Sequence, residues 1–260
     1  MASTENFFVA GVLHLPPLPG APASQGEFQA VLDHALRDAD ALLAGGIRAV
    51  VIENFGDAPF FANSVPPHVP AMMAVIGSRV RGRFDSMGIN VLRNDGHAAI
   101  GVAAASQADF VRVNVFTGAA WTDQGLIQGQ AAELTRYRAM LGQHSTAIMA
   151  DVRVKHAVPA GTHCIETLAR EALGRGGANG LIVTGRGTGE PTDLDDIRRV
   201  KGVAGARPVW VGSGTTPDTV RAISQLADGA IVGTVLHLDG DIRAPIDVDR
   251  VRSVTEAMGA

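Results

Sequence analysis

Ionisable and amide side chains follow the first five of a series of short apolar runs in this sequence. In chain order they are His14, Glu53, Asn54, Asn94, Asp95, Asn114, Asp151 and Lys155. Carboxylates and histidines exchange protons with a substrate, and a lysine can form an imine with a carbonyl compound. We therefore predict that the ionisable members carry acid–base catalysis and that the asparagines bind substrate.

The carboxylates among them also have structural interpretations. Glu53 and Asp151 end buried strands, where an ionised carboxylate has to be paired, and Arg112 or Arg153 is the available partner. Asp95 could serve only to cap the helix that begins after it. A third possibility is that Glu53, Asp95 and Asp151 hold Mg²⁺ together, because oxygen ligands suit that ion. No H-x-x-H or C-x-x-C pair indicates another metal.

Small residues take the place of ionisable ones after the last two apolar runs. They are Gly212, Ser213, Gly214, Gly233 and Thr234. Glycines let an anion approach the backbone closely, and free N–H groups at a helix start attract negative charge. Thr216 followed by Pro217 is typical of such a helix start. The two glycine turns together predict a phosphate site, although a tight turn alone would explain either of them.

A further glycine-rich segment follows the sixth apolar run and contains Thr184, Gly185 and Arg186. Its glycine spacing differs from the dinucleotide-binding fingerprint. It could be a flexible loop without function. The alternative is that it forms a lid or a wall of the phosphate site, with Arg186 supplying positive charge.

Eight apolar runs position these residues along the chain. The runs are Phe8–Leu13, Ala49–Ile52, Ile89–Leu92, Phe110–Val115, Ala147–Val152, Gly180–Val183, Pro208–Val211 and Gly229–Val232. They are apolar at consecutive positions, as strands buried on both faces are, and helix-like segments separate them. An open doubly wound sheet and a closed barrel both fit this alternation. The first run ends without a G-x-G-x-x-G turn, so we predict a single-domain (β/α)₈ barrel over residues 1–260.

Composition limits the classes of function. The 260 residues are 46% hydrophobic and 18% charged, with a net charge of −4 and no basic run, so we expect no nucleic-acid or membrane partner. The single cysteine, Cys164, precludes an internal disulfide and favours a reducing compartment. We expect a cytoplasmic protein, and a homo-oligomer by analogy with other barrels.

Long motifs of this chain resemble the BtpA/SgcQ family over nearly its whole length. They include the segments at 11–20, 53–60, 90–95, 111–115, 122–127, 151–157 and 184–191. The resemblance implies a (β/α)₈ barrel with a phosphate site like that of ribulose-phosphate-binding barrels. One departure is Arg153, at a position where the family commonly has histidine. One branch of the family is named for photosystem I accumulation, and another is associated with sugar uptake.

Two hypotheses about function follow. The first is an enzyme that acts on a phosphorylated sugar or nucleotide-like substrate, making or breaking a glycosidic bond or isomerising a phosphosugar. The second is a non-enzymatic assembly or regulatory factor that uses the barrel as a docking scaffold. Charged residues at the ends of buried strands favour the enzyme, because a scaffold does not require them.

Overall fold

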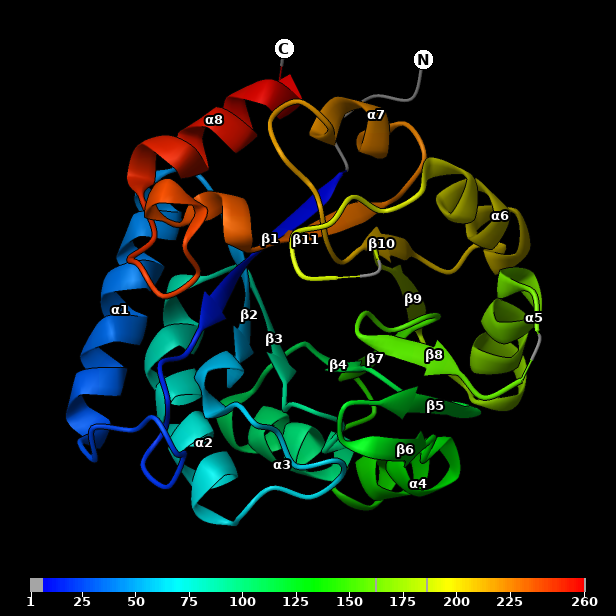
Figure 1. Cartoon of the computed structure of the whole chain (residues 1–260), viewed down its shortest axis with the longest axis horizontal. Coiled ribbons are helices and arrows are strands. Elements are labelled where there is room, and N and C mark those ends of the chain that lie inside the picture. The colour runs from blue at the N-terminus through cyan, green and yellow to red at the C-terminus, as the bar shows by residue number, and fades with distance from the viewer. Residues whose placement is uncertain (1–6, 162, 186, 260) are drawn as a thin grey trace.

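The computed structural model describes residues 7–161, 163–185 and 187–259, and its centre is a closed barrel of parallel strands (Figure 1). The strands are β1 (Phe8–His14), β2 (Ala49–Glu53), β3 (Ser86–Asn90), β4 (Phe110–Val113), β7 (Ala147–Asp151), β9 (Gly180–Val183), β10 (Val209–Val211) and β11 (Gly229–Val232). Their order around the barrel follows the chain, and β11 closes it by pairing with β1. The predicted (β/α)₈ barrel is therefore confirmed.

Helices surround the barrel and connect successive strands. They are α1 (Phe28–Ala44), α2 (His68–Val80), α3 (Gly96–Ser106), α4 (Ala131–Met140), α5 (Ile165–Arg170), α6 (Leu194–Ala204), α7 (Val220–Ser224) and α8 (Val248–Gly259). Parallel strands run in the same direction, so the chain must cross from the end of one strand back to the start of the next, and a helix usually makes this crossover. All strands consequently end at one face of the barrel, where their carboxyl-terminal residues meet.

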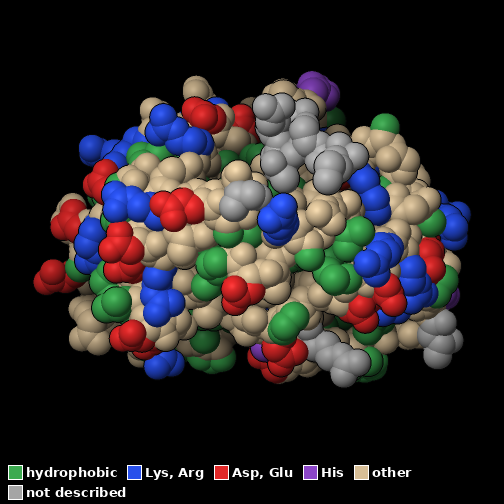
Figure 2. All heavy atoms as spheres, turned by 90° about the horizontal axis from the view of Figure 1, so that it is seen from above, with side chains coloured by type: hydrophobic (Ala, Val, Ile, Leu, Met, Phe, Trp, Pro, Cys, Tyr) green, Lys and Arg blue, Asp and Glu red, His purple; other side chains and the backbone are tan. Residues whose placement is uncertain are grey.

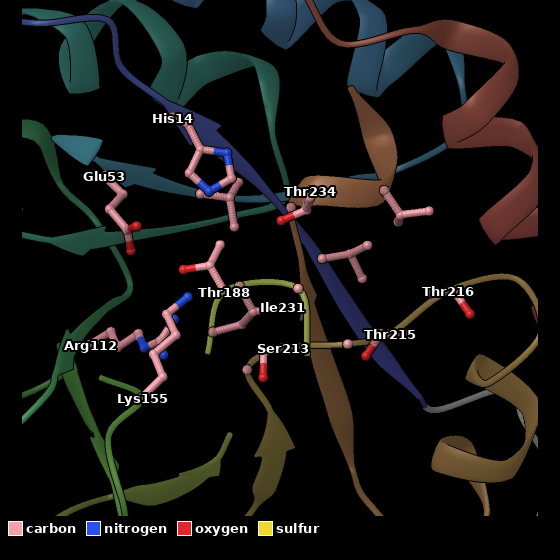
Figure 3. Close-up of a pocket in the computed structure, with 17 residues that line it drawn as sticks. His14, Glu53, Arg112, Lys155, Thr188, Ser213, Thr215, Thr216, Ile231 and Thr234 are labelled. Atoms are coloured by element: carbon pink, nitrogen blue, oxygen red, sulfur yellow. The ribbon is translucent and has the colours of Figure 1, made fainter. Parts of the chain in front are cut away.

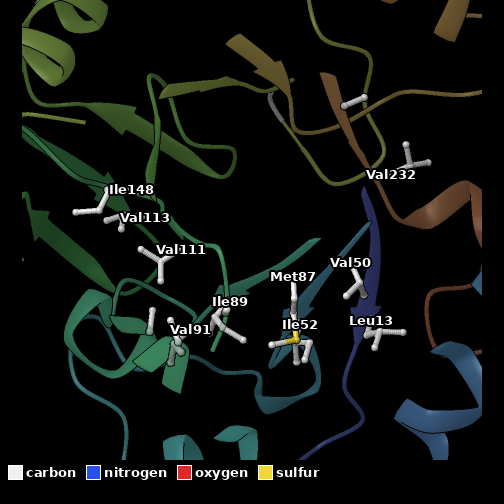
Figure 4. Close-up of a cluster of buried hydrophobic side chains, with 14 of the residues drawn as sticks. Leu13, Val50, Ile52, Met87, Ile89, Val91, Val111, Val113, Ile148 and Val232 are labelled. Carbon is white, nitrogen blue, oxygen red and sulfur yellow. The ribbon is translucent and has the colours of Figure 1, made fainter. Parts of the chain in front are cut away.

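Apolar side chains fill two separate layers. The outer layer lies between the strands and the helices, and Figure 4 shows its strand side, with Val50 and Ile52 from β2 beside Met87 and Ile89 from β3. The inner layer fills the barrel itself. At its amino-terminal end Phe8 stacks on Trp210 with ring centroids 4.5 Å apart, and Phe110 meets Trp210 edge-on. The interior is therefore a packed core with an aromatic floor, as (β/α)₈ barrels require.

A small antiparallel sheet was absent from the sequence prediction. It consists of β5 (Ala119–Thr122), β6 (Gly125–Gln128) and β8 (Ala157–Pro159), and it lies near the carboxyl ends of β4 and β7 (Figure 1). Ala120 and Ile127 are buried on one face. Trp121 lies opposite both Leu126 and Val158 in the register, and all three are exposed.

Three local predictions need correction. The strand predicted at Ile89–Leu92 runs instead from Ser86 to Asn90, because its first residues are less apolar than those that follow. The helix expected from Thr192 begins at Leu194, and its cap is Asp193, whose carboxylate accepts the N–H of Asp195. The helix expected from Thr216 begins at Val220, because the residues after Thr216 form a turn first.

The face of the molecule in Figure 2 carries interspersed charges of both signs. Figure 2 shows Lys and Arg side chains beside Asp and Glu side chains on the face it presents, without a region of one sign. Within the described part of the chain, no helix combines the length and the apolar character that crossing a bilayer demands.

Candidate active site

One cavity of about 200 Å³ opens at the carboxyl ends of the strands, opposite the aromatic floor (Figure 3). Residues from the first and the last strands line it together. Those that the sequence predicted are His14, Glu53, Lys155, Gly212, Ser213, Gly214, Gly233 and Thr234, and those that it did not are Val12, Arg112, Thr188, Gly189, Thr215, Thr216, Ile231, Val232 and Val235. The two predicted groups, ionisable residues and glycine turns, therefore meet in a single space.

His14 ends β1 and is almost fully buried. Its Nδ1 lies 3.1 Å from Nε2 of His237, and Nδ1 of His237 lies 2.6 Å from the carbonyl oxygen of Ala244. Burial lowers the pKa of His14 well below its usual value, and His237, Lys155 and Arg112 lower it further. The buried position of His14 therefore favours its neutral form. No sequence motif marks His237, which follows a single 3₁₀ turn, Thr234–Leu236.

Glu53 and Lys155 complete the ionisable side of the cavity. In Figure 3 the side chains of Glu53 from β2, His14 from β1 and Lys155 from the segment after β7 converge on one space. Glu53 is buried, with 4% of the residue exposed. Its carboxylate forms no hydrogen bond with any described side chain. Burial lowers the pKa of Lys155, as does Arg112, whereas Glu53 and Asp151 raise it. Arg93 donates to the carbonyl of Lys155 and holds that segment in place.

Arg112 is the buried partner that the structural interpretation required for Asp151, but it forms no ion pair with Glu53. Its Nε and Nη2 donate to the two oxygens of Asp151, each at 3.0 Å, and Asn114 donates to Asp151 as well. Burial alone would lower the pKa of Arg112, but Asp151 raises it above its usual value. Asp151 is thus paired and held by a network, whereas Arg153 lies near Asp196 on the outside.

The glycine turns form the other side of the cavity. Gly214 has φ of +70°, and a Cβ there would lie 2.4 Å from Cα of Pro191. A Cβ on Gly233 would lie 2.5 Å from Cε1 of His14, so the absence of a side chain lets the ring stand beside this turn. The hydroxyl of Thr215 is buried and has no hydrogen-bond partner among the described residues. A buried polar group without a partner is costly, and a ligand can remove that cost.

The glycine-rich segment after β9 forms a wall of this cavity through Thr188 and Gly189. The hydroxyl of Ser213 ties this segment down, because it accepts the N–H of Gly185 and donates to the carbonyl of Glu190. The N–H of Thr188 donates to Nε2 of His156 at 3.2 Å. Thr184 donates to the carbonyl of Arg153, away from the cavity. The predicted role of Arg186 lies outside the described residues.

Seven of the described residues that the sequence predicted for the site do not line the cavity: Asn54, Asn94, Asp95, Asn114, Asp151, Thr184 and Gly185. Asn54 accepts the N–H of Leu92 and donates to Asp57, and Asn94 makes a pair of hydrogen bonds with the backbone of Val115. Asn114 belongs to the Asp151 network. The carboxylate of Asp95 accepts two backbone N–H groups, one of them at the start of α3, which is the capping arrangement. Their hydrogen-bonding capacity is thus used within the protein.

The grouping of Glu53, Asp95 and Asp151 around Mg²⁺ is not formed. Asp95 holds the start of α3, and the charge of Asp151 is compensated by Arg112. Among the described residues, no three histidine, cysteine or acidic side chains come together in a way that could hold a metal ion.

The fold and the site define a (β/α)₈ barrel whose mouth combines a glycine-lined hollow with ionisable side chains. The comparison with family models agrees: the model described as the BtpA family matches residues 5–260, and the chain belongs to that family. Among curated relatives, the photosystem I biogenesis protein BtpA of Synechocystis sp. is 44% identical over 251 residues, covering 96% of this chain and 87% of its own.

Two solved structures illustrate the shared fold. A 3-hexulose-6-phosphate synthase superposes with a TM-score of 0.61 at 13% identity, covering 96% of this chain and 99% of its own. The phosphoribosyl anthranilate isomerase of Thermus thermophilus gives a TM-score of 0.57 at 11% identity, with coverage of 97% and 98%. At such low identity these likenesses establish the barrel architecture alone.

Proposed function

We propose that the protein is an enzyme that acts on a phosphorylated sugar or nucleotide-like substrate by acid–base chemistry at the barrel mouth. One observation carries the proposal: a single cavity has glycine turns suited to an anion on one side and His14, Glu53 and Lys155 on the other. A substrate held by its phosphate at the first side would present its sugar carbons to the second.

The phosphate would bind between the turns after β10 and β11. The N–H groups of Gly214, Thr215, Gly233 and Thr234 enter none of the backbone hydrogen bonds among the described residues. N–H groups arranged in a concave turn bind anions, and the unpartnered hydroxyl of Thr215 would add a donor. Lys155 lines the same cavity and would supply positive charge.

The reaction would be a proton transfer on the bound sugar. For an isomerisation, His14 or Glu53 removes a proton beside the carbonyl and returns it to the neighbouring atom. For a glycosidic bond, the Glu53 carboxylate stabilises the cationic sugar carbon while another group exchanges a proton with the departing base. Lys155 offers a third route, because its lowered pKa leaves more of the neutral amine that forms an imine.

A thermal-shift screen tests the substrate class. Phosphosugars and nucleotides should raise the melting temperature more than their dephosphorylated counterparts, because only they fill the glycine hollow. Thr215→Val should weaken the response without altering the shape of the side chain, whereas Thr135→Val on α4, away from the cavity, should not. A screen in which the phosphate group makes no difference contradicts the proposal.

Two variants then separate the chemical routes once a binder is turned over. Glu53→Gln should reduce the rate by about 10²–10⁴-fold with binding retained, the range for loss of a general acid or base. Borohydride added during turnover should label Lys155 if an imine forms, and Lys155→Met should abolish the label. Full activity of the Glu53 variant would remove Glu53 from the mechanism, and absence of a label would remove the imine.

A second function, that of an assembly factor, has one observation in its favour. Trp121, Leu126 and Val158 form an exposed apolar row on the small sheet. The Synechocystis relative is named for photosystem I biogenesis. An assembly factor would depend on that row and tolerate changes in the cavity. Complementation with Trp121→Ser and with Glu53→Gln distinguishes the two, since the enzyme requires Glu53 and the docking scaffold requires Trp121.

A further inference from the structure

His14 and His237 form a chain of ring nitrogens that ends on a backbone carbonyl. Nδ1 of His14 faces Nε2 of His237 at 3.1 Å, and Nδ1 of His237 faces the carbonyl oxygen of Ala244 at 2.6 Å. His237 is fully buried and does not line the cavity. The contact of His237 with the cavity therefore runs through His14.

The carbonyl at the end of the chain fixes the protons. A carbonyl oxygen only accepts, so Nδ1 of His237 must carry the hydrogen. Burial lowers the pKa of His237, so the ring is neutral and its Nε2 has a lone pair. That lone pair accepts from Nδ1–H of His14. His14 is neutral too, because burial lowers its pKa, and its own Nε2 is left without a hydrogen.

Burial is the main reason that both rings favour the neutral form, and nearby charges modify its effect. His14 faces Lys155 and Arg112, whose positive charges oppose a second proton on its ring. Burial has the largest effect on the pKa of His237 and lowers it, whereas the carbonyl of Ala244 and the carboxylate of Asp38 raise it by less. His34 lowers this pKa slightly, and Asp241 raises it slightly. Nε2 of His14 stands 3.1 Å from the position of a Cβ on Gly233, at the glycine side of the cavity. Figure 3 shows a ring nitrogen of His14 turned toward the space that Glu53 and Lys155 share.

We propose that His237 is a positioning residue that holds His14 in the Nδ1–H tautomer, so that Nε2 of His14 is a proton acceptor facing the substrate. Free histidine in water favours the opposite tautomer, with the hydrogen on Nε2, so the buried pair reverses the preference of the isolated ring. In a reaction step the substrate proton moves to Nε2 of His14, and the bonding electron pair stays on the substrate. The role of His14 as the base rests on the proposed function, but the tautomer does not.

Long-range ¹H–¹⁵N NMR of protein labelled in its histidines tests the proposal without any substrate. At pH 8 His14 should show a protonated Nδ1 and an unprotonated Nε2, with the signals assigned by their loss in His14→Gln. His237→Phe, which offers no acceptor, should move the hydrogen of His14 to Nε2. His237→Gln, which retains an acceptor oxygen, should restore the Nδ1–H pattern. His144→Gln, at an exposed position, should leave the His14 signals unchanged.

Each result decides the matter. A hydrogen on Nε2 of His14 in the unaltered protein overturns the proposal, and so does an unchanged His14 pattern in His237→Phe. If the phenylalanine variant does not fold, the unaltered protein and His237→Gln still give the answer. A failed phosphosugar screen with the predicted tautomer present would reject the proposed function and leave the positioning role of His237 intact.

Discussion

The two ends of the barrel interior differ in the kind of side chain that fills them: aromatic rings at the floor and polar groups at the mouth. At the floor, the rings of Phe8, Phe110 and Trp210 pack against one another. At the mouth, Glu53 has no hydrogen-bond partner among the described side chains, and the hydroxyl of Thr215 is buried without one. The packed floor therefore stabilises the fold, whereas the mouth contains polar groups without hydrogen-bond partners, which a bound ligand would supply.

The mouth itself is divided by the same criterion. Arg112, Asp151 and Asn114 satisfy one another through three hydrogen bonds of 3.0 Å. His14, Glu53 and Lys155 stand beside this network and line the cavity. A buried charge near a cavity is thus a catalytic candidate only where no partner within the protein already compensates it.

The largest loss of stability should come from the floor. Phe110→Ala removes a ring that packs edge-on against both Phe8 and Trp210, and we expect the free energy of unfolding to fall by about 3–5 kcal/mol. Phe61→Ala, at a residue that is 56% exposed, is the matched control and should change it little. Urea unfolding monitored by circular dichroism measures both. Equal effects of the two variants would show that the floor is not the stabilising core.

The second-largest loss of stability should come from the hydrogen-bonded network of Arg112, Asp151 and Asn114 at the mouth. Arg112→Met leaves the buried carboxylate of Asp151 without its partner, so we expect a loss of about 3 kcal/mol. Arg112→Met combined with Asp151→Leu removes both charges and should recover much of that loss. The same unfolding experiment compares them. A single variant as stable as the unaltered protein would mean that the pair is not coupled.

A smaller effect is expected at the glycine that admits the His14 ring. Gly233→Ala forces the ring to move, and overpacking of this kind costs about 1–3 kcal/mol. Gly202→Ala on α6 meets no atom within 4 Å and serves as the control. Differential scanning calorimetry should show a lower melting temperature for the first variant only. The first variant should also lose phosphate binding, and normal binding would separate Gly233 from the anion site.

The smallest effect concerns pH. The pKa values of His14 and His237 are lowered in the folded protein by burial, so the unfolded chain takes up protons below about pH 6.5 that the folded chain does not. The free energy of unfolding should therefore decrease as the pH falls from 7.5 to 5.5. His14→Gln should show a smaller decrease in urea unfolding at the two pH values. An identical decrease would place the titration elsewhere.

The fold could be predicted largely because doubly buried strands leave a strong mark on the sequence. Runs such as Ala49–Ile52 and Gly180–Val183 fall within a residue of the observed strands β2 and β9. The three-stranded sheet could not be predicted, because β5 and β8 are short and half exposed. The start of α7 was misplaced, because a threonine followed by proline favours a turn as readily as a helix.

The site was predictable in part for a related reason. A polar residue after a buried strand can turn into the cavity or clamp a neighbouring loop, and the sequence alone does not distinguish His14 from Asn94. Arg112 left a signal, because an arginine inside an apolar strand needs a partner. His237 left none, because its hydrogen bonds are to the carbonyl of Ala244 and to a partner more than 200 positions away in the chain.

Titration with inorganic phosphate followed by ¹H–¹⁵N NMR tests most directly whether the mouth is an anion site. The amide signals of Gly214, Thr215, Gly233 and Thr234 should shift together in a saturable way, because phosphate accepts their N–H groups. Gly229, which packs against Trp210 at the floor, should not move. Unmoved signals at the four mouth amides, or shifts of equal size at Gly229, would contradict the assignment of the mouth as the ligand-binding end.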